Sequence, residues 1–180
     1  MREIDKRTRV SRRVFLRTGA TAVPAAAAVA TGMTIGADAA WADTAKSLKP
    51  ATMATLAKLA RDIYPHDRLA EAFYIKAVAG YDAMAGKDPK LAKTIEDGVS
   101  ALDAAAKAKF GSAYIAVLWE RDRLSVLTPQ IDGPLAKKLR GDMLITLYNN
   151  PDTWAKFGYE GASADKGGYI ARGFNDIDWL

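Results

Sequence analysis

The stretch PATMATLAKLARDI, residues 50–63, decides the fold class of this 180-residue chain. Its large apolar side chains recur at intervals of three and four residues, the spacing of one face of an α-helix: Leu56, Leu59 and Ile63. We expect an amphipathic helix that begins near Thr52, whose hydroxyl would serve as the N-cap, and that ends just before Pro65. Similar patterns recur along the chain, so the sequence predicts an all-α domain of about five amphipathic helices.

Two more helices are predicted after this stretch. Residues 69–84 place four apolar side chains along one side before Gly86, namely Phe73, Ala77, Val78 and Tyr81. Asp88-Pro89 is a helix start signal, and the helix it opens is expected to run to about Lys109. Its inward-facing residues are Leu91, Ile95, Val99 and Leu102. Gly98 lies inside this helix, where glycine costs about 1 kcal/mol relative to alanine, so we expect close packing there.

Two further segments complete the predicted domain. Residues 113–127 could begin as a short strand, but the spacing of their apolar residues favours a helix. The charged run at 120–123 is then expected to be a solvated helix face with ion pairs. A loop bracketed by Thr128-Pro129 and Gly133-Pro134 precedes a fifth helix over 135–149. That helix carries Leu135, Leu139, Met143, Leu144, Leu147 and Tyr148.

The chain changes character after the predicted helical domain at 43–150. Residues 151–180 are rich in glycine and aromatic residues and show no helical periodicity, yet they are too aromatic for a disordered tail. We expect an irregular, ordered extension that packs on the domain or on a partner. Its rings are interpreted equally well as a cover for the domain's own core or as a partner interface. The candidate interface residues are Trp154, Phe157, Tyr159, Tyr169, Phe174 and Trp179.

The amino-terminal residues 1–42 resemble a twin-arginine export signal. The motif residues are Ser11, Arg12, Arg13, Phe15 and Leu16. An uncharged, alanine- and glycine-rich stretch follows over 18–35, which is too weakly apolar for a stable membrane span. This route is used by bacteria for proteins exported already folded, so a periplasmic location is expected. The competing interpretation is a basic amphipathic helix that happens to contain Arg-Arg.

The end of this leader carries small residues in an A-x-A-like pattern. Ala40 and Ala42 flank Trp41, which predicts cleavage before Asp43. Ala37 and Ala39 offer a second position for the cut.

Composition excludes several functional classes. Residues 1–42 hold seven Lys and Arg against three acidic residues, so much of the +5 net charge belongs to the leader, and no nucleic-acid partner is expected. The chain has no cysteine, which excludes disulfides, thiolate chemistry and covalent haem attachment. With one histidine, a multi-histidine metal site is excluded and no metal ligands are predicted. We expect neither a cofactor nor catalytic residues in this chain.

His66 is a candidate for acid–base chemistry. It follows a helix end in the sequence Tyr64-Pro65-His66-Asp67, so Asp67 could orient it as a general base. The favoured interpretation is that His66 caps helix carbonyls or bonds locally in the turn. Glu96 and Asp97 do not form a natural carboxylate pair, because adjacent helix positions point about 100° apart.

Four stretches resemble the gluconate 2-dehydrogenase subunit 3 family of small, non-catalytic subunits. They are LARDIYPHD at 59–67, FGYEG at 157–161, GGY at 167–169 and RGFNDIDW at 172–179. The resemblance implies a small (gamma) subunit of a periplasmic FAD-dependent sugar or gluconate-type dehydrogenase complex. It implies that FAD and the dehydrogenase activity reside in a large partner subunit, which passes electrons to a cytochrome c subunit or to another acceptor. The leader would engage the twin-arginine translocase and export both subunits together.

Two other classes remain open at this point. One is a free-standing periplasmic binding module, or an assembly factor for another exported enzyme. The other is an enzyme centred on His66, which would be active as the purified chain and would lose that activity in His66→Ala.

Overall fold

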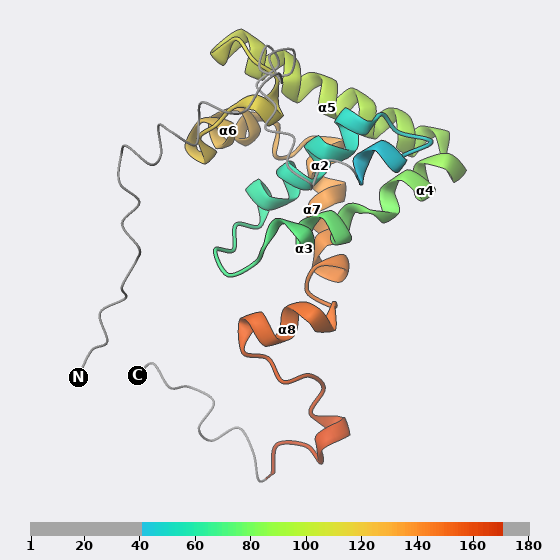
Figure 1. Ribbon diagram of the computed structural model, residues 1–180, viewed down its shortest axis with the longest axis vertical. Coiled ribbons are helices and arrows are strands. Elements are labelled where there is room, and N and C mark those ends of the chain that lie inside the picture. The colour runs from blue at the N-terminus through green and yellow to red at the C-terminus, as the bar shows by residue number, and fades with distance from the viewer. Residues whose placement is uncertain (1–40, 171–180) are drawn as a thin grey trace, which may run out of the picture. The chain divides into compact units, whose positions relative to one another are not determined.

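The computed structural model describes residues 41–170, and Figure 1 shows how their helices are arranged. Between residues 41 and 170 there are α-helices and short 3₁₀ helices (η) but no strand, which confirms the all-α prediction. The elements are η3 (Ala42–Thr44), α2 (Pro50–Ile63), α3 (Glu71–Val78), α4 (Gly80–Lys87), α5 (Pro89–Phe110), η4 (Tyr114–Ala116), α6 (Glu120–Leu127), η5 (Thr128–Gln130), α7 (Pro134–Thr146), α8 (Pro151–Phe157) and η6 (Ala164–Lys166).

Helix α2 lies at the centre of the core, as its sequence predicts. It packs against α3, α5, α6 and α7, and most of its side chains are buried. Thr52 is not the N-cap, because Lys49 occupies that position and Pro50 begins the helix. The Thr52 hydroxyl lies one turn further in and donates a hydrogen bond to Glu96 on α5, with an O···O distance of 3.0 Å. The third residue of the helix therefore bonds a neighbouring helix instead of its own end.

Helix α5 begins and ends where the sequence predicts. The Asp88 carboxylate accepts hydrogen bonds from the backbone N–H groups of Lys90 and Leu91, at 2.9 and 3.3 Å. Gly111 closes the helix in the left-handed conformation, with φ 73°. The predicted inward residues are buried, except for the partly buried Leu91.

Gly98 marks the close contact between α5 and α7 that was predicted for it. A Cβ added at Gly98 would lie 2.5 Å from the Leu135 Cβ, closer than real Cβ atoms approach. Because Gly98 has no side chain, Leu135 packs directly against the α5 backbone. This contact fixes where α7 begins over the core.

Residues 69–84 form two helices instead of the single predicted one. Helix α3 ends at Val78 and α4 begins at Gly80. Helix α3 packs mainly on α2 and also on α7, whereas α4 packs on α5. The two helices therefore pack on different parts of the core. The break between them lies beside Gly80, and glycine is a weak helix former. The buried faces still include Ala77, Val78 and Tyr81.

The predicted helix over 113–127 is wrong in its first half. Tyr114–Ala116 form the 3₁₀ turn η4, the chain is extended through Trp119, and α6 begins at Glu120. The backbone N–H of Tyr114 donates to Asp103 at 2.9 Å, and Arg123 binds carbonyl groups of the extended part. These contacts use backbone groups that a regular helix would use internally.

The end of the fold also differs from the prediction. Helix α7 stops at Thr146, and Leu144 is exposed instead of facing the core. Helix α8 forms where no helix was expected, because Asn150 caps it with a bond from the Asp152 N–H at 3.2 Å and Gly158 terminates it. None of the helices within residues 41–170 is long and apolar enough to cross a bilayer.

Candidate functional site

The aromatic side chains after Asn150 differ in how they pack. The indole N–H of Trp154 donates to the Tyr148 carbonyl at 2.8 Å, and the Tyr159 ring lies edge-on to Trp154 with 5.3 Å between centroids. Phe157 lies edge-on to the His66 ring, at 5.0 Å. Trp154 is thus tied to its own domain, and the rings of Phe157 and Tyr159 touch the domain along one edge.

The remaining ring surface faces outward. Phe157 is 38% exposed, Tyr159 is 47% exposed and Tyr169 is 57% exposed. We call these three residues the C-terminal aromatic surface. Of the other candidate interface residues, Trp154 is half-buried, and Phe174 and Trp179 lie outside the described residues. Other rings contact Phe157 and Tyr159, and exposed aromatic side chains concentrate at protein interfaces.

His66 does not have the surroundings of an oriented general base. Its ring Nε2 lies 2.6 Å from the hydroxyl oxygen of Tyr148, a contact across the fold, and its backbone carbonyl accepts a local turn bond from the Leu69 N–H at 3.2 Å. Asp67 forms its ion pair with Arg61, at 3.6 Å. Burial, with the Arg61 cation as the second cause, lowers the pKa of His66 below its ordinary value and so favours the neutral ring. Burial raises the pKa of Tyr148, which favours its neutral hydroxyl.

Asp62 and Arg123 form a buried ion pair that the sequence did not predict. The Arg123 guanidinium binds both carboxylate oxygens of Asp62, at 2.7 Å each, and the Tyr114 hydroxyl donates to Asp62 at 2.7 Å. The third guanidinium nitrogen, Nη1, donates to the carbonyls of Val117 and Leu118, at 2.9 Å each. Burial raises the pKa of Tyr114, and the Asp62 carboxylate acts in the same direction.

This ion pair corrects the prediction that residues 120–123 form a solvated face. Arg121 is exposed, but Arg123 is buried with Asp62. The buried side-chain nitrogen and oxygen atoms of Asp62 and Arg123 all have hydrogen-bond partners within the protein. We assign the ion pair a structural role, which is to hold the extended segment at Val117 and Leu118.

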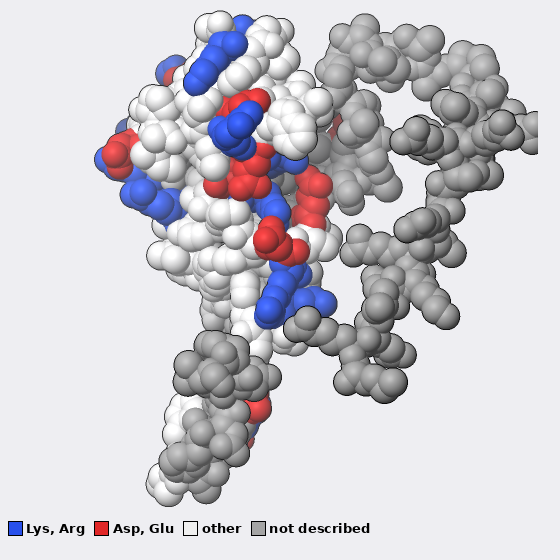
Figure 2. Space-filling view, turned by 90° about the vertical axis from the view of Figure 1, so that its left-hand side faces the viewer, with Lys and Arg blue, Asp and Glu red and all other residues white. Residues whose placement is uncertain are grey.

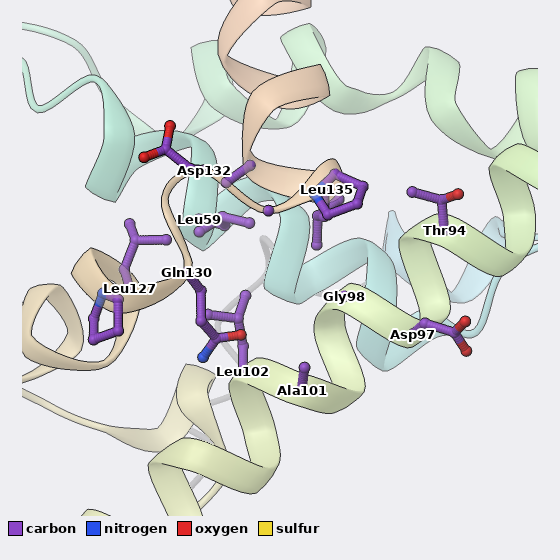
Figure 3. Close-up of a pocket in the computed structure, with 14 residues that line it drawn as sticks. Leu59, Thr94, Asp97, Gly98, Ala101, Leu102, Leu127, Gln130, Asp132 and Leu135 are labelled. Carbon is purple, nitrogen blue, oxygen red and sulfur yellow. The ribbon is translucent and has the colours of Figure 1, made fainter.

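A groove of about 490 Å³ lies between α5 and the segment that joins α6 to α7. Its lining is mostly hydrocarbon, and Figure 3 shows Leu59, Leu102 and Leu135 together with the carboxylates of Asp97 and Asp132 at opposite ends. Lys93 pairs with Asp97 at 2.7 Å. The groove has a volume suited to a small ligand and offers apolar contact with a polar group at each end.

The export motif lies outside the described residues, as does Ala40. Ala42 and Asp43 belong to η3, and the Ala42 side chain is buried. Within residues 41–170, no group of three or more histidine and acidic side chains is placed to hold a metal ion.

Comparison of the chain with family models, with curated proteins and with solved structures found no match.

Proposed function

We propose that this chain is the non-catalytic small subunit of a periplasmic FAD-dependent dehydrogenase complex, of the sugar or gluconate type. In this proposal it binds a large flavoprotein, supports its folding and brings it to the twin-arginine translocase. FAD and the dehydrogenase chemistry belong to the partner, and a cytochrome c subunit accepts the electrons. The observation that carries the proposal is the C-terminal aromatic surface, together with the leader motif at residues 11–17.

The C-terminal aromatic surface has the properties of a binding surface for a folded protein. Phe157 is positioned by rings of its own domain, at 5.0 Å from His66 and 5.6 Å from Tyr148. Tyr159 is positioned by Trp154 and by a backbone bond from its N–H to the Trp154 carbonyl, at 2.9 Å. Side chains that are held before binding lose little conformational entropy when a partner covers them. Aromatic residues of this kind dominate binding energy at interfaces.

The leader supports the export part of the proposal. A signal for folded substrates at 11–17 is useful to a partner that lacks its own signal and travels as a complex. The resemblance to subunit 3 proteins supports the same arrangement, because it spans both residues 59–67, which are the end of α2 and the turn after it, and the aromatic segment.

The test is affinity purification of the tagged chain from its host, followed by mass spectrometry and an absorbance spectrum. We expect a large flavoprotein in roughly equimolar amount, with flavin bands and dye-linked oxidation of a sugar substrate. The double variant Phe157→Ala/Tyr159→Ala should recover at least about tenfold less flavoprotein, since interface hot spots cost 2 kcal/mol or more. Phe110→Ala is the matched control, because Phe110 is 37% exposed on another part of the domain.

Two outcomes would contradict the proposal. A colourless protein recovered alone would remove the flavoprotein partner. Equal loss of flavoprotein in the Phe110 control would show that the aromatic surface has no special role.

Export is tested separately with Arg12→Lys/Arg13→Lys. This variant should leave both the chain and the flavoprotein in the cytoplasm, which fractionation and immunoblotting would detect. Normal periplasmic delivery of the flavoprotein in this strain would show that the partner does not depend on this leader.

Truncation after Asn150 tests the placement of the interface. The shortened chain should keep the circular dichroism of α2–α7 and lose the flavoprotein. Loss of helicity in parallel with loss of the partner would mean that the aromatic segment serves mainly as part of the domain's own core.

The groove of Figure 3 favours a second candidate, a free-standing periplasmic binding module. In that case the purified domain should be stabilised against heat by a small apolar ligand. Ala101→Trp, which places a large ring at the groove lining, should abolish that stabilisation. A domain that binds no small ligand but purifies with the flavoprotein rejects this candidate.

A further inference from the structure

Residues 41–49 are an integral part of the folded domain. Ala42 is 2% exposed within the hydrophobic core, Leu48 is also buried, and Trp41 packs against the same core. Backbone bonds close the turn η3, from the Thr44 N–H to the Trp41 carbonyl at 3.2 Å and from the Ala45 N–H to the Ala42 carbonyl at 3.1 Å. The residues on both sides of the Ala42–Asp43 bond therefore lie in a packed turn.

Two carboxylates hold the rest of this segment to the helices. Asp82 on α4 accepts from three successive backbone N–H groups, those of Lys46, Ser47 and Leu48, at 2.8–3.1 Å. Glu96 on α5 accepts from the Lys49 N–H at 3.0 Å and pairs with its ammonium group, also at 3.0 Å. Hydrogen bonds to ionised acceptors are among the strongest in proteins, so the segment is fixed along its length.

The α4 backbone also approaches this segment closely. A Cβ added at Gly86 would lie 2.6 Å from the Ser47 Oγ. The segment thus fits against α4 at a point where a side chain is absent. Packing and polar contacts agree that residues 41–49 do not form a free linker.

A peptidase needs a different conformation of its substrate. It binds the chain in an extended form on both sides of the bond that it cuts, and accessible, poorly anchored segments are the usual sites of cleavage. Recognition of an A-x-A pattern at 40–42 also requires contact with the small side chain of Ala42, which is buried here. Cleavage between Ala42 and Asp43 would require residues 41–49 to leave the domain first.

We propose that the fold of residues 41–49 shields the Ala42–Asp43 bond, so that a peptidase can cut this bond only after the segment leaves the domain. The shielding does not rest on the proposed export. Hydrolysis of the bond adds one water molecule, leaves a new carboxylate on Ala42 and leaves a new amino group on Asp43.

Shielding can be tested on the purified full-length chain with a protease that cuts after alanine. Intact mass spectrometry should show that the product beginning at Asp43 forms slowly under native conditions and rapidly in urea, where the domain is unfolded. A product beginning at Asp43 that forms as fast under native conditions as in urea would overturn the proposal.

Variants of the two anchoring carboxylates sharpen this test. Asp82→Ala/Glu96→Ala should raise the native rate of cleavage before Asp43 at least tenfold. Asp97→Ala is the matched control, because Asp97 is the neighbour of Glu96 on α5 and pairs with Lys93 instead. Circular dichroism identifies a variant that fails to fold, and the comparison of native and urea-treated wild type decides the question in that case. Equal rates in a folded double variant and in wild type would contradict anchoring by these carboxylates.

Amino-terminal sequencing of the periplasmic protein tests whether the shielding holds in the cell. A chain that retains Trp41 and Ala42 supports it, and a chain that begins at Asp43 overturns it. A chain found only in the cytoplasm would contradict the proposed export, and the result with the purified protein would still decide whether the bond is shielded.

Discussion

The two ends of the described chain are attached to the domain in different ways. At the amino-terminal end, residues 41–49 contribute Ala42 and Leu48 to the core, and carboxylates from two helices bind their backbone. At the carboxyl-terminal end, α8 is tied by the buried Thr153, whose hydroxyl donates to the Leu147 carbonyl at 2.9 Å. Beyond α8, the Lys166 ammonium group pairs with the nearby Glu160 carboxylate at 3.3 Å.

This difference separates a structural end from an end available for binding. The backbone N–H groups of residues 46–49 are bonded to α4 and α5, so they cannot bond a partner unless this segment first leaves the core. Segments with few buried apolar contacts open at lower free energy than the core does. Figure 2 shows charged side chains of both signs mixed over the helical part of the face that it views, so no single-sign patch identifies a partner there. The rings of the C-terminal aromatic surface are therefore the clearer interface candidate.

The largest expected effect comes from breaking the polar centre of the well-anchored region. Arg123→Ala leaves the buried Asp62 carboxylate without its cation, so the free energy of unfolding should fall by about 3–5 kcal/mol. Urea denaturation followed by circular dichroism measures this change. Arg121→Ala, two residues away and exposed, should change stability by no more than about 0.5 kcal/mol. Similar losses in both variants would remove the special role of Asp62 and Arg123.

The next effect concerns the contact between α5 and α7. Gly98→Ala places a Cβ against Leu135 and should destabilise the domain by about 1–3 kcal/mol, because the added methyl group overpacks the interface. Gly141→Ala has open space around it within α7 and should stabilise the domain by up to about 1 kcal/mol. Opposite signs of the two changes in thermal denaturation would confirm the close approach, and equal signs would contradict it.

Acid should weaken the amino-terminal attachment selectively. Hydrogen bonds from the Leu48, Lys46 and Ser47 backbones lower the pKa of Asp82 in the folded protein below its ordinary value of 3.8. The unfolded state therefore binds the proton first, and the stabilisation from Asp82 is complete above that value and is lost as the pH falls through the lower, folded pKa. The difference in melting temperature between wild type and Asp82→Asn should shrink below about pH 4. A constant difference down to pH 2 would contradict this assignment.

The smallest expected effect is at the junction of the two regions. Tyr148→Phe removes the hydroxyl that contacts His66 and should cost about 0.5–1.5 kcal/mol, the net value of one hydrogen bond. The aromatic contacts with Phe157 remain, so flavoprotein recovery should stay within about twofold of wild type. A large loss of recovery would show that the His66–Tyr148 contact positions the aromatic surface.

Features that depend on neighbouring residues could be predicted from the sequence, whereas features that depend on contacts between distant residues could not. Helices α2 and α5 were predicted closely, because apolar periodicity and the Asp88-Pro89 start signal are local features. The extended segment before α6 was not predicted, since it depends on Arg123 reaching Asp62 across 61 positions of the chain. Helix α8 has local start and stop signals in Asn150-Pro151 and Gly158, which could have predicted it. The glycine-rich and aromatic composition of the segment favoured an irregular structure instead.

Candidate-site residues show the same limit. The aromatic composition after residue 150 identified the rings, but their exposure depends on how the segment packs. The hydroxyl partner of His66 lies 82 positions away, and the anchoring role of Asp82 spans 34–36 positions, so no local pattern indicates either contact. The spacing of residues along the sequence does not indicate which distant residues contact each other in the fold.

The ion pair between Asp62 and Arg123 can form only late in translation, because the two residues are 61 positions apart. A ribosome that adds about 5–20 residues per second delivers Arg123 roughly 3–12 s after Asp62, and until then the first long helix lacks its buried counterion. The proposed leader leaves the ribosome before any of these groups. Under the proposed export of folded protein, the leader would thus be exposed for seconds before its domain can close. Translation speed over residues 62–123 would then set the interval in which other cytoplasmic proteins can bind the nascent chain.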